Sequence, residues 1–408
     1  MQSNKFKSAG TFPGSPKWEQ AIKREQELYA RPNEIRSEFS RDYNRILHCK
    51  AYRRLKHKTQ VFFATTNDHI CTRMEHVSHV ASVSETISNF LGLNTELTRA
   101  IAIGHDLGHA PFGHKGEVIL KQIAKNELDE PFWHEKNSLW FVDKLEMLTS
   151  QSGEKKNLSL TYGVRDGIIS HCGEVNENAL KPRDEAIDLY EIERPNQYSP
   201  YTWEGCVVKI SDKISYLGRD IEDAITLKIL NRDQLRELSH ILSYKTNLQL
   251  RDINNTVLIH DFITDLCHQS SPEEGIRFSE KYLDLINSVK AFNYKHIYNH
   301  PRLKYFHAYA DLIITTIFEV LINNYRKVNT FDEVLKLNEI YPELSASFYD
   351  WIITYAGSDS QQRNLYKFGN EIIYDITKRA DYVKAIIHYI SSTTDHFAIS
   401  LFNEITKF

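Results

Sequence analysis

The sequence predicts a mostly α-helical protein. The chain has 408 residues but only 16 glycines and 11 prolines, about half the usual share of these two residue types. Few turn-forming residues mean long elements, which argues against a β-sandwich or a propeller. Apolar residues recur at steps of three and four in several segments, as they do on the buried face of a helix, whereas alternating polar and apolar segments are scarce.

The helical pattern can be followed along the chain. It runs through residues 76–91 and then through 97–108, where the second helix should end because a proline and two glycines follow. It returns over 206–227 and then continues in later stretches such as DLIITTIFEVLI and DYVKAIIHYISS. Residues 150–205, rich in Ser, Asn and Gly with three prolines, should form loops and short helices.

The net charge of −4 hides an asymmetry along the chain. Residues 1–60 hold 14 Lys/Arg and 6 Asp/Glu, a local charge of +8, so the remaining residues carry −12. A basic segment of this kind either attracts polyanions, such as nucleotides or nucleic acid, or forms a solvated helix face. Charge alone does not separate the two.

Cysteine usage and the first residues indicate a cytoplasmic protein. The five cysteines are odd in number and form no CxxC pair, which favours buried inert thiols over a disulfide framework or a thiolate zinc site. The polar start predicts no signal peptide. No run approaches the ~18 apolar residues of a membrane span, so we expect no membrane partner.

Histidines are concentrated in one part of the chain. Nine of the 18 lie between residues 48 and 134, and His105-Asp106 stands between an apolar helix and a glycine-rich turn. Imidazole nitrogen and carboxylate oxygen together suit a divalent metal such as Mn, Fe, Zn or Mg. His76 begins the preceding helix, and an antiparallel helix pair could bring it close to His105. The sequence has no HExxH motif, which excludes the usual metalloprotease arrangement.

A second helix offers a distant carboxylate. Asp212, Tyr216 and Asp220 step by four residues, which places them on one face that differs from the apolar face of the same helix. Such a polar face either contacts water or lines a binding site. The spacing alone favours water, so other features must decide.

Six segments carry a resemblance to a known family. They are FSRDYNRILHCKAYRRLKHKTQVF (39–62), TRMEHVSHV (72–80), HDLGHAPFGHKGE (105–117), WHEKNS (133–138), SDKISYLGRDIEDAI (211–225) and YISSTTDHFA (389–398). In order and spacing the chain resembles the HD-domain deoxynucleoside triphosphate triphosphohydrolases, the dGTPase family, over most of its length. The resemblance implies an HD-domain helical fold with additional C-terminal helices.

The resemblance also implies roles for individual residues. The residues matching the ligands of one divalent metal ion are His76, His105, Asp106 and Asp212. The residues matching the catalytic pair are His114 and Glu117. Those matching groups that face the triphosphate are Arg73, His109 and His134, with Lys213 as a lesser candidate. Those matching the sugar site are Gln60 and Asp220 at the 3′-hydroxyl, Tyr216 under the ring, where a 2′-hydroxyl would clash, and its neighbour Val61.

These roles imply hydrolysis of a deoxynucleoside triphosphate, with dGTP as the favoured substrate, to deoxynucleoside and inorganic triphosphate. A metal-activated water would attack the α-phosphate, while His114, held by Glu117, would protonate the departing 5′-oxygen. Two alternatives stay open. One is another HD phosphohydrolase, acting on nucleoside monophosphates or signalling nucleotides. The other is a regulator that binds nucleotide or DNA without catalysis.

Charge and composition suggest three regions: a basic arm with a pocket helix over 1–60, an HD metal-binding catalytic core over 61–230, and a C-terminal helical region over 231–408. The resemblance also implies a homo-oligomer, with a hexamer favoured. Single-stranded DNA and an allosteric dNTP are further candidate ligands. The C-terminal signature departs from the family form DYIxGMTD, because His388 replaces the first Asp and Ser392-Thr393 replaces Gly-Met. Lys384 takes a place where members often carry Arg.

Overall fold

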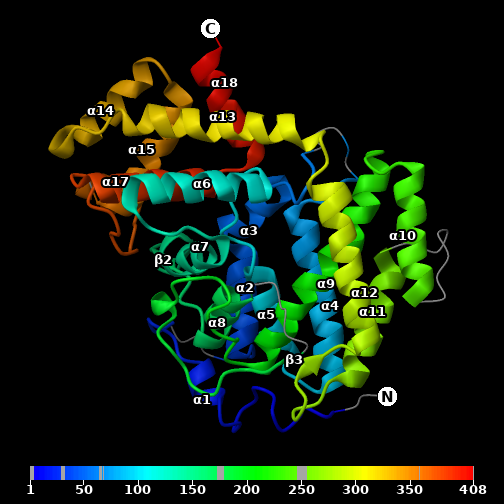
Figure 1. Cartoon of the computed structure of the whole chain (residues 1–408). Coiled ribbons are helices and arrows are strands. Elements are labelled where there is room, and N and C mark those ends of the chain that lie inside the picture. Colours follow the sequence, from blue (N-terminus) through cyan, green and yellow to red (C-terminus); the bar gives the residue numbers. More distant parts are fainter. Residues whose placement is uncertain are drawn as a thin grey trace. The chain divides into compact units, whose positions relative to one another are not determined.

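The computed structural model describes residues 4–28, 33–63, 67, 69–171, 179–245, 255–357 and 359–407. The described residues are mostly helical, with two short two-stranded sheets (Figure 1). The predicted fold class is therefore confirmed.

The chain forms two compact units, and each unit combines three stretches of sequence. Unit 1 contains Met1–Asn44, Gln60–His105 and Leu160–Lys304. Unit 2 contains Arg45–Thr59, Asp106–Ser159 and Tyr305–Phe408. This division differs from the three consecutive regions expected from the sequence, which remain a prediction about how function is distributed.

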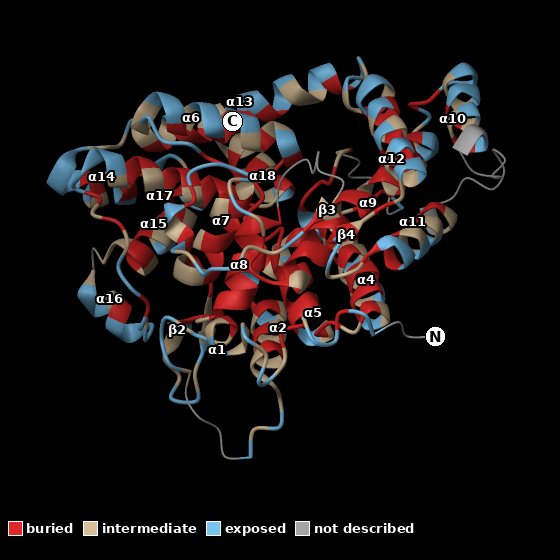
Figure 2. Cartoon of the chain, turned by 60° about the horizontal axis from the view of Figure 1, so that its bottom comes forward, coloured by how far each residue is buried: buried red, intermediate tan, exposed pale blue. Residues whose placement is uncertain are grey.

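Unit 1 is built mainly from α-helices around an apolar core. Its helices are α1 (Trp18–Ala21), α4 (Arg73–Leu91), α5 (Thr95–Gly104), α8 (Tyr162–Ser170), the 3₁₀ helix η3 (Leu189–Glu191), α9 (Trp203–Thr226), α10 (Arg232–Lys245), α11 (Asn255–Gln269), α12 (Glu280–Asn293) and the π-helix η5 (Tyr294–Tyr298). Strands β3 (Ala179–Leu180) and β4 (Ile276–Arg277) pair antiparallel. Figure 2 shows α4, α5, α8 and α9 as largely buried elements.

The ends of α4 and α5 follow from their sequences. Thr72 and Glu75 form a capping box at the start of α4, and Gly92, whose φ of +84° suits glycine, caps its C-terminal end. The Asn94 side chain accepts hydrogen bonds from the first amides of α5. Helix α5 then ends at Gly104, four residues before the expected end, because the chain continues as a turn in which His109 N–H donates to Asp106 O (3.3 Å).

Unit 2 holds most of the remaining elements. They are α3 (Lys50–Arg54), η1 (Leu55–His57), α6 (Gly113–Leu128), α7 (His134–Trp140), the π-helix η2 (Phe141–Leu145), β1 (Met147–Thr149), β2 (Lys155–Asn157), η6 (Lys327–Asn329), α14 (Thr330–Lys336), η7 (Leu337–Glu339), α15 (Pro342–Ala356), α16 (Ser360–Leu365), α17 (Arg379–Ser392) and α18 (Asp395–Thr406). Strands β1 and β2 pair antiparallel. Two helices, α2 (Glu38–His48) and α13 (Leu303–Ile322), continue from one unit into the other.

Helices α6 and α17 lie side by side in unit 2 (Figure 1). Their exposed edges carry ion pairs, Arg379 with Glu127 at 2.5 Å and Lys384 with Glu130 at 2.8 Å. Such partly exposed pairs contribute little to stability, so apolar packing must hold these helices. The buried residues of α17 include Val383, Ile386 and Ile390.

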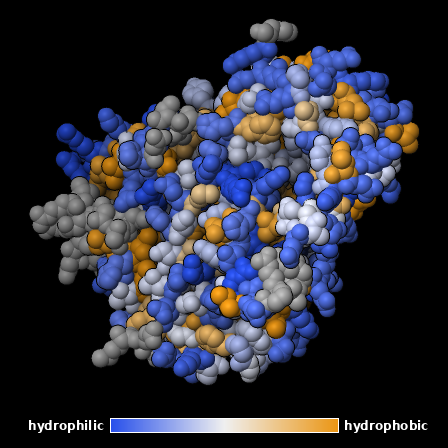
Figure 3. Space-filling view, turned by 180° about the vertical axis from the view of Figure 1, so that it is seen from behind, coloured by the Kyte–Doolittle hydropathy of each residue, from blue (hydrophilic) through white to orange (hydrophobic). Residues whose placement is uncertain are grey.

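Helix α13 corrects the expectation that no segment is apolar enough to span a membrane. It has 20 residues, and its most apolar 18-residue stretch has a mean hydropathy of 1.4, which meets the length and composition of a span. The core helix of a soluble protein meets the same criterion. Ile313, Ile317 and Leu321 of α13 are buried, whereas Tyr305 and Leu312 are exposed. On the face shown in Figure 3, hydrophobic residues lie in small groups among hydrophilic ones.

The described cysteines match the expectation of inert thiols. Cys49, Cys71, Cys206 and Cys267 are free and buried, and burial raises the pKa of Cys71, Cys206 and Cys267 to about 12. A thiol with a raised pKa is a poor nucleophile at neutral pH. Cys172 lies outside the described residues.

Candidate metal centre and active site

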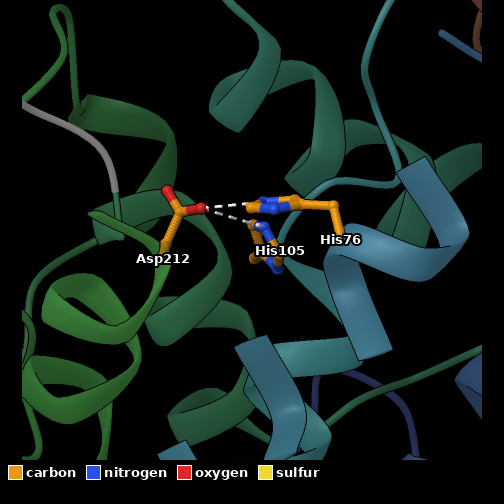
Figure 4. A group of neighbouring side chains, drawn as sticks. All are labelled: His76, His105 and Asp212. Atoms are coloured by element: carbon orange, nitrogen blue, oxygen red, sulfur yellow. Dashed lines mark hydrogen bonds and ion pairs between the residues drawn. The ribbon is translucent and has the colours of Figure 1, made fainter. Parts of the chain in front are cut away.

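Three of the four predicted metal ligands meet in unit 1. His76 comes from the first turn of α4, His105 follows the last residue of α5, and Asp212 lies in α9. His76 Nε2 lies 2.9 Å and His105 Nε2 lies 3.8 Å from Asp212 Oδ1. Figure 4 shows both imidazole rings directed at this carboxylate. The antiparallel helix pair expected from the sequence therefore delivers His76 to His105.

The hydrogen bonds around His105 define which nitrogen faces the carboxylate. His105 Nδ1 lies 2.6 Å from Ala102 O, and a carbonyl oxygen only accepts, so Nδ1 carries the proton in the neutral ring. Nε2 then lies on the side of the ring that faces Asp212. Metal-ligating histidines generally donate their second nitrogen in this way, which fixes the ring and the tautomer.

The environment of Asp212 keeps it ionised. Burial alone would raise its pKa, but the hydrogen bond from His76 and the charges of His105 and His171 hold the pKa of this carboxyl below its usual value. The ligand atoms of His76, His105 and Asp212 all lie within 4.8 Å of one another. Two imidazole nitrogens and one carboxylate oxygen fit a divalent transition metal. This side-chain group is therefore a candidate metal centre.

Asp106, the fourth predicted ligand, belongs to a second cluster, in unit 2. Its Oδ1 lies 3.0 Å from His109 Nε2. The rings of His109 and His134 stack at a centroid distance of 3.8 Å. Asp106, His109 and His134 thus form a compact group of their own. Asp106 directly follows His105 in the chain, and its role as a metal ligand stays a prediction.

His134 lies between two carboxylates in unit 2. Its Nδ1 is 3.1 Å from Glu117 Oε2, and its Nε2 is 3.2 Å from Glu135 Oε1. Burial alone would lower its pKa, but the charges of Glu135 and Glu117 raise the pKa of His134 to about 10. His134 is therefore a cation at neutral pH, as suits a residue predicted to face a triphosphate.

The predicted catalytic pair lies on the first turns of α6. His114 and Glu117 are separated by less than one helical turn, and the rings of His109 and His114 lie 5.9 Å apart. Glu117 accepts from His134 N–H (3.1 Å) as well as from the His134 ring. Burial opposes ionisation of Glu117, but the charges of His134, His109 and His114 lower its pKa.

Two glycines allow the turn before α6 to pack closely. A Cβ atom at Gly108 would meet Ser138 N of α7 at 2.2 Å, and one at Gly116 would meet Pro111 O at 1.8 Å. Both distances are far below a van der Waals contact, so a side chain at either position would displace backbone. The glycines of the HDLGHAPFGHKGE segment thus set how near α6 and α7 lie to the loop 106–112.

The predicted sugar-binding residues lie in unit 1, and one of them, Asp220, is a buried acid. Tyr298 of η5 donates to Asp220 Oδ2 at 2.5 Å. Burial raises the pKa of Asp220 to about 7, while the hydrogen bond from Tyr298 opposes this rise. Within the described part of the chain, Gln60 Oε1 is buried and has no hydrogen-bond partner. A buried amide oxygen of this kind usually marks a place for a ligand or water.

The other predicted substrate residues have clear places in unit 1. Arg73 is the first residue of α4 and is 1% exposed, and its charge acts on Asp220. Tyr216 and Val61 pack against the apolar core of unit 1, and Lys213 is buried in α9. The expectation that the Asp212–Tyr216–Asp220 face contacts water fails for Asp220, which is 2% exposed.

The sequence did not single out three residues of these groups: Tyr298, Glu135 and His171. His171 caps the end of α8 and contacts Ile168 O through Nδ1 at 2.6 Å, and its ring lies 4.9 Å from that of His105. Its position at a helix end, like that of His105, is the signal that could have found it. Tyr298 gives no such signal, because it lies 78 residues beyond Asp220.

Comparisons with known proteins agree with this geometry. The HD domain family model matches residues 73–217, a range that contains all four predicted metal ligands. A deoxyguanosinetriphosphate triphosphohydrolase-like protein of Desulfatibacillum aliphaticivorans is 36% identical over 77% of this chain and 82% of its own length. The chain belongs to this dGTPase-like family.

Further relatives carry the same name. The dGTPase-like protein of Caldanaerobacter subterraneus subsp. tengcongensis is 34% identical over 76% of this chain and 78% of its own length. That of Rickettsia prowazekii is 29% identical over 92% of this chain and 93% of its own length. The likeness therefore extends well beyond the HD domain, and the dGTPase-like family is one of nucleotide triphosphohydrolases.

Proposed function

We propose that the protein hydrolyses deoxynucleoside triphosphates, with dGTP favoured, to deoxynucleoside and inorganic triphosphate. The observation that carries the proposal is the convergence of His76 Nε2 and His105 Nε2 on Asp212 Oδ1, at 2.9 and 3.8 Å. The donor set fits Mn, Mg, Fe or Zn, and we propose Asp106 as its fourth member. When bound, such a metal acidifies water and neutralises phosphate charge.

The proposed mechanism assigns the phosphates and the leaving group to charged side chains. Arg73, His109 and His134 bind the triphosphate, with Lys213 as a weaker contact, and the cationic state of His134 supports this role. His114 gives a proton to the departing 5′-oxygen, and Glu117 keeps the histidine in place. Phosphoryl transfer depends mainly on such positioning and electrostatic stabilisation.

Sugar selection is assigned to residues of unit 1. Gln60 and Asp220 bind the 3′-hydroxyl, and the buried Gln60 Oε1, with no partner among the described residues, supports this. Tyr298 orients Asp220 through its hydroxyl. Tyr216 packs under C2′, where a ribose hydroxyl would clash with its ring, and Val61 lies beside it.

Partners beyond the substrate are proposed from the sequence. We propose a homo-oligomer, with a hexamer favoured, and a cytoplasmic location. Basic side chains of the arm pair within the chain, Arg24 with Glu38 and Asp42 and Arg36 with Glu34, which favours a paired helix surface over a nucleic-acid site. Single-stranded DNA and an activating dNTP remain ligands to test.

The test is a product analysis. The metal-loaded protein is incubated with each dNTP and NTP, singly and mixed, and separately with nucleoside monophosphates and signalling nucleotides. Nucleoside, triphosphate, pyrophosphate and phosphate are resolved by chromatography. The proposal expects deoxynucleoside and intact triphosphate from dNTPs. Release of phosphate from monophosphates or signalling nucleotides would support another HD phosphohydrolase, and binding without turnover would support a regulator.

A further inference from the structure

The carboxylate of Asp395 holds two distant backbone segments of unit 2. Asp395 begins α18 and is 2% exposed. Its Oδ2 accepts from Thr59 N–H at 2.9 Å, and its Oδ1 accepts from Phe112 N–H at 2.8 Å. Both donors are backbone amides outside regular helical hydrogen bonding, so the carboxylate supplies the partners that these buried amides need.

A second buried charged side chain, that of Lys58, also binds two separate backbone segments of unit 2. Lys58 is 1% exposed, and its ammonium group donates to His109 O and, at 2.8 Å, to Ser391 O. Ser391 Oγ in turn accepts from Asn137 Nδ2 of α7 (3.2 Å), and the same amide donates to Gly108 O (2.5 Å). The segment 391–395 and the segment 58–59 therefore enclose the loop 106–112.

This loop has a backbone conformation that needs support. Phe112 has a φ of +63°, the left-handed region that an aromatic residue rarely adopts. Phe112 is also the residue before α6, so its conformation sets the direction in which α6 leaves the loop. His114 and Glu117 lie on the first turns of that helix. A change in the backbone conformation of Phe112 would therefore displace both side chains.

We propose that Asp395 and Lys58 are positioning residues that fix the loop 106–112 and thereby the catalytic pair His114 and Glu117. The inference rests on the proposed function of that pair. It gives the C-terminal signature a role: the Asp that this chain retains at 395 holds the active-site loop. The altered residue His388 instead packs against Trp140 (rings 5.4 Å apart), and its Nδ1 lies 2.7 Å from Tyr374 OH.

The main test is the variant Asp395→Asn, which keeps the volume and replaces one acceptor oxygen by a donor facing a backbone N–H. We expect kcat for dGTP to fall at least about 10-fold, because small displacements of reacting groups have large kinetic effects. The KM and the bound metal should stay within twofold of wild type. Amide hydrogen exchange should rise in peptides that contain Thr59 and Phe112. Lys58→Met should show the same pattern.

The matched control is Tyr382→Phe, on α17. It removes a buried hydrogen bond, from Tyr382 OH to Leu321 O at 2.8 Å, without touching the loop. We expect wild-type kcat and unchanged exchange at Thr59 and Phe112. If Tyr382→Phe lowers kcat as much as Asp395→Asn at equal loss of thermal stability, the effect is general destabilisation and the proposal is overturned. Unchanged kcat in both Asp395→Asn and Lys58→Met also overturns it.

Hydrogen exchange separates this inference from the proposed function. If the wild type hydrolyses no dNTP, the proposed function fails, and the exchange data still decide whether Asp395 and Lys58 hold the loop. Raised exchange confined to peptides spanning 59 and 106–112 supports that structural part. If exchange rises there while dGTP turnover persists unchanged, the proposed function stands and the positioning role is wrong.

Discussion

Histidines in the two clusters have different hydrogen-bond partners. The Nδ1 of His105 donates to the backbone carbonyl of Ala102, so its Nε2 lies on the side of Asp212, an arrangement typical of metal-ligating histidines. Two carboxylates raise the pKa of His134 to about 10, so this ring is a cation suited to an anionic substrate. Neighbouring acceptors thus assign different chemistry to the same side chain.

The role of His114 can be tested without disturbing the candidate metal centre. His114→Ala should reduce kcat at least ~10²-fold, the usual scale of acid catalysis, while metal content and KM stay close to wild type. Single-turnover kinetics and metal analysis measure both. His79→Ala, at a half-buried position of α4, is the control and should be fully active. Loss of metal in His114→Ala would make this residue a ligand instead of an acid.

Asp220 should make stability depend on pH. Its pKa is about 7 in the folded protein and ~3.9 in an unfolded chain. The folded state therefore binds more protons between these values, and stability falls as pH rises from about 4 to about 7. Asp220→Asn keeps an acceptor for Tyr298 but cannot ionise, so its melting temperature should exceed that of wild type by a margin that grows from about pH 4 to about pH 7 and then levels off.

Thermal melts at several pH values check this expectation. Asp233→Asn, which replaces an exposed aspartate of α10, is the control and should follow the wild-type profile throughout. A constant difference between Asp220→Asn and wild type over the whole pH range would show that Asp220 is ionised already at low pH.

Helix α9 carries three of the proposed functional residues at one-turn intervals. Asp212, Tyr216 and Asp220 follow the period of the helix, so a metal ligand, a sugar contact and an acid can share one rigid support.

Tyr216→Ala should narrow the ratio of dNTP to NTP turnover, because it opens space at C2′. The control is Tyr282→Ala, which removes an aromatic ring packed on the same core and should leave the ratio unchanged. Competition assays with dGTP and GTP measure the ratio. Equal rates for both nucleotides in the wild type would contradict the assignment.

Periodic elements could be predicted from sequence, and irregular ones could not. The residues of α4 and α9 alternate with the helical period, so both helices were predicted close to their observed ends. The end of α5 depends on the turn at 105–108, whose conformation follows from contacts of Gly108 with α7. The π-helix η5, which supplies Tyr298 to Asp220, has no sequence signature, because its geometry depends on tertiary packing.

At the scale of the whole molecule, sequence order and spatial grouping diverge. The chain passes from unit 1 to unit 2 between the two residues of the HD dipeptide: His105 ends one stretch of unit 1, and Asp106 begins a stretch of unit 2. Composition and charge vary along the chain, so they indicated consecutive regions. Interleaved units arise from long-range contacts, such as that of Asp395 with Thr59, and neither periodicity nor composition reports these.

Metal binding should stabilise the folded chain as a whole. His76, His105 and Asp212 come from α4, the end of α5 and α9, and an unfolded chain does not keep them together, so metal binds the native state preferentially. At 100 times the Kd such binding adds about 2.7 kcal/mol. A chelator should therefore lower the melting temperature by several degrees, and excess metal should restore it.

His105→Ala should melt at the same temperature with and without chelator, whereas His79→Ala should respond like wild type. If the chelator lowers the melting temperature of His105→Ala as much as that of wild type, the stabilising metal lies elsewhere and the assignment of this centre is wrong.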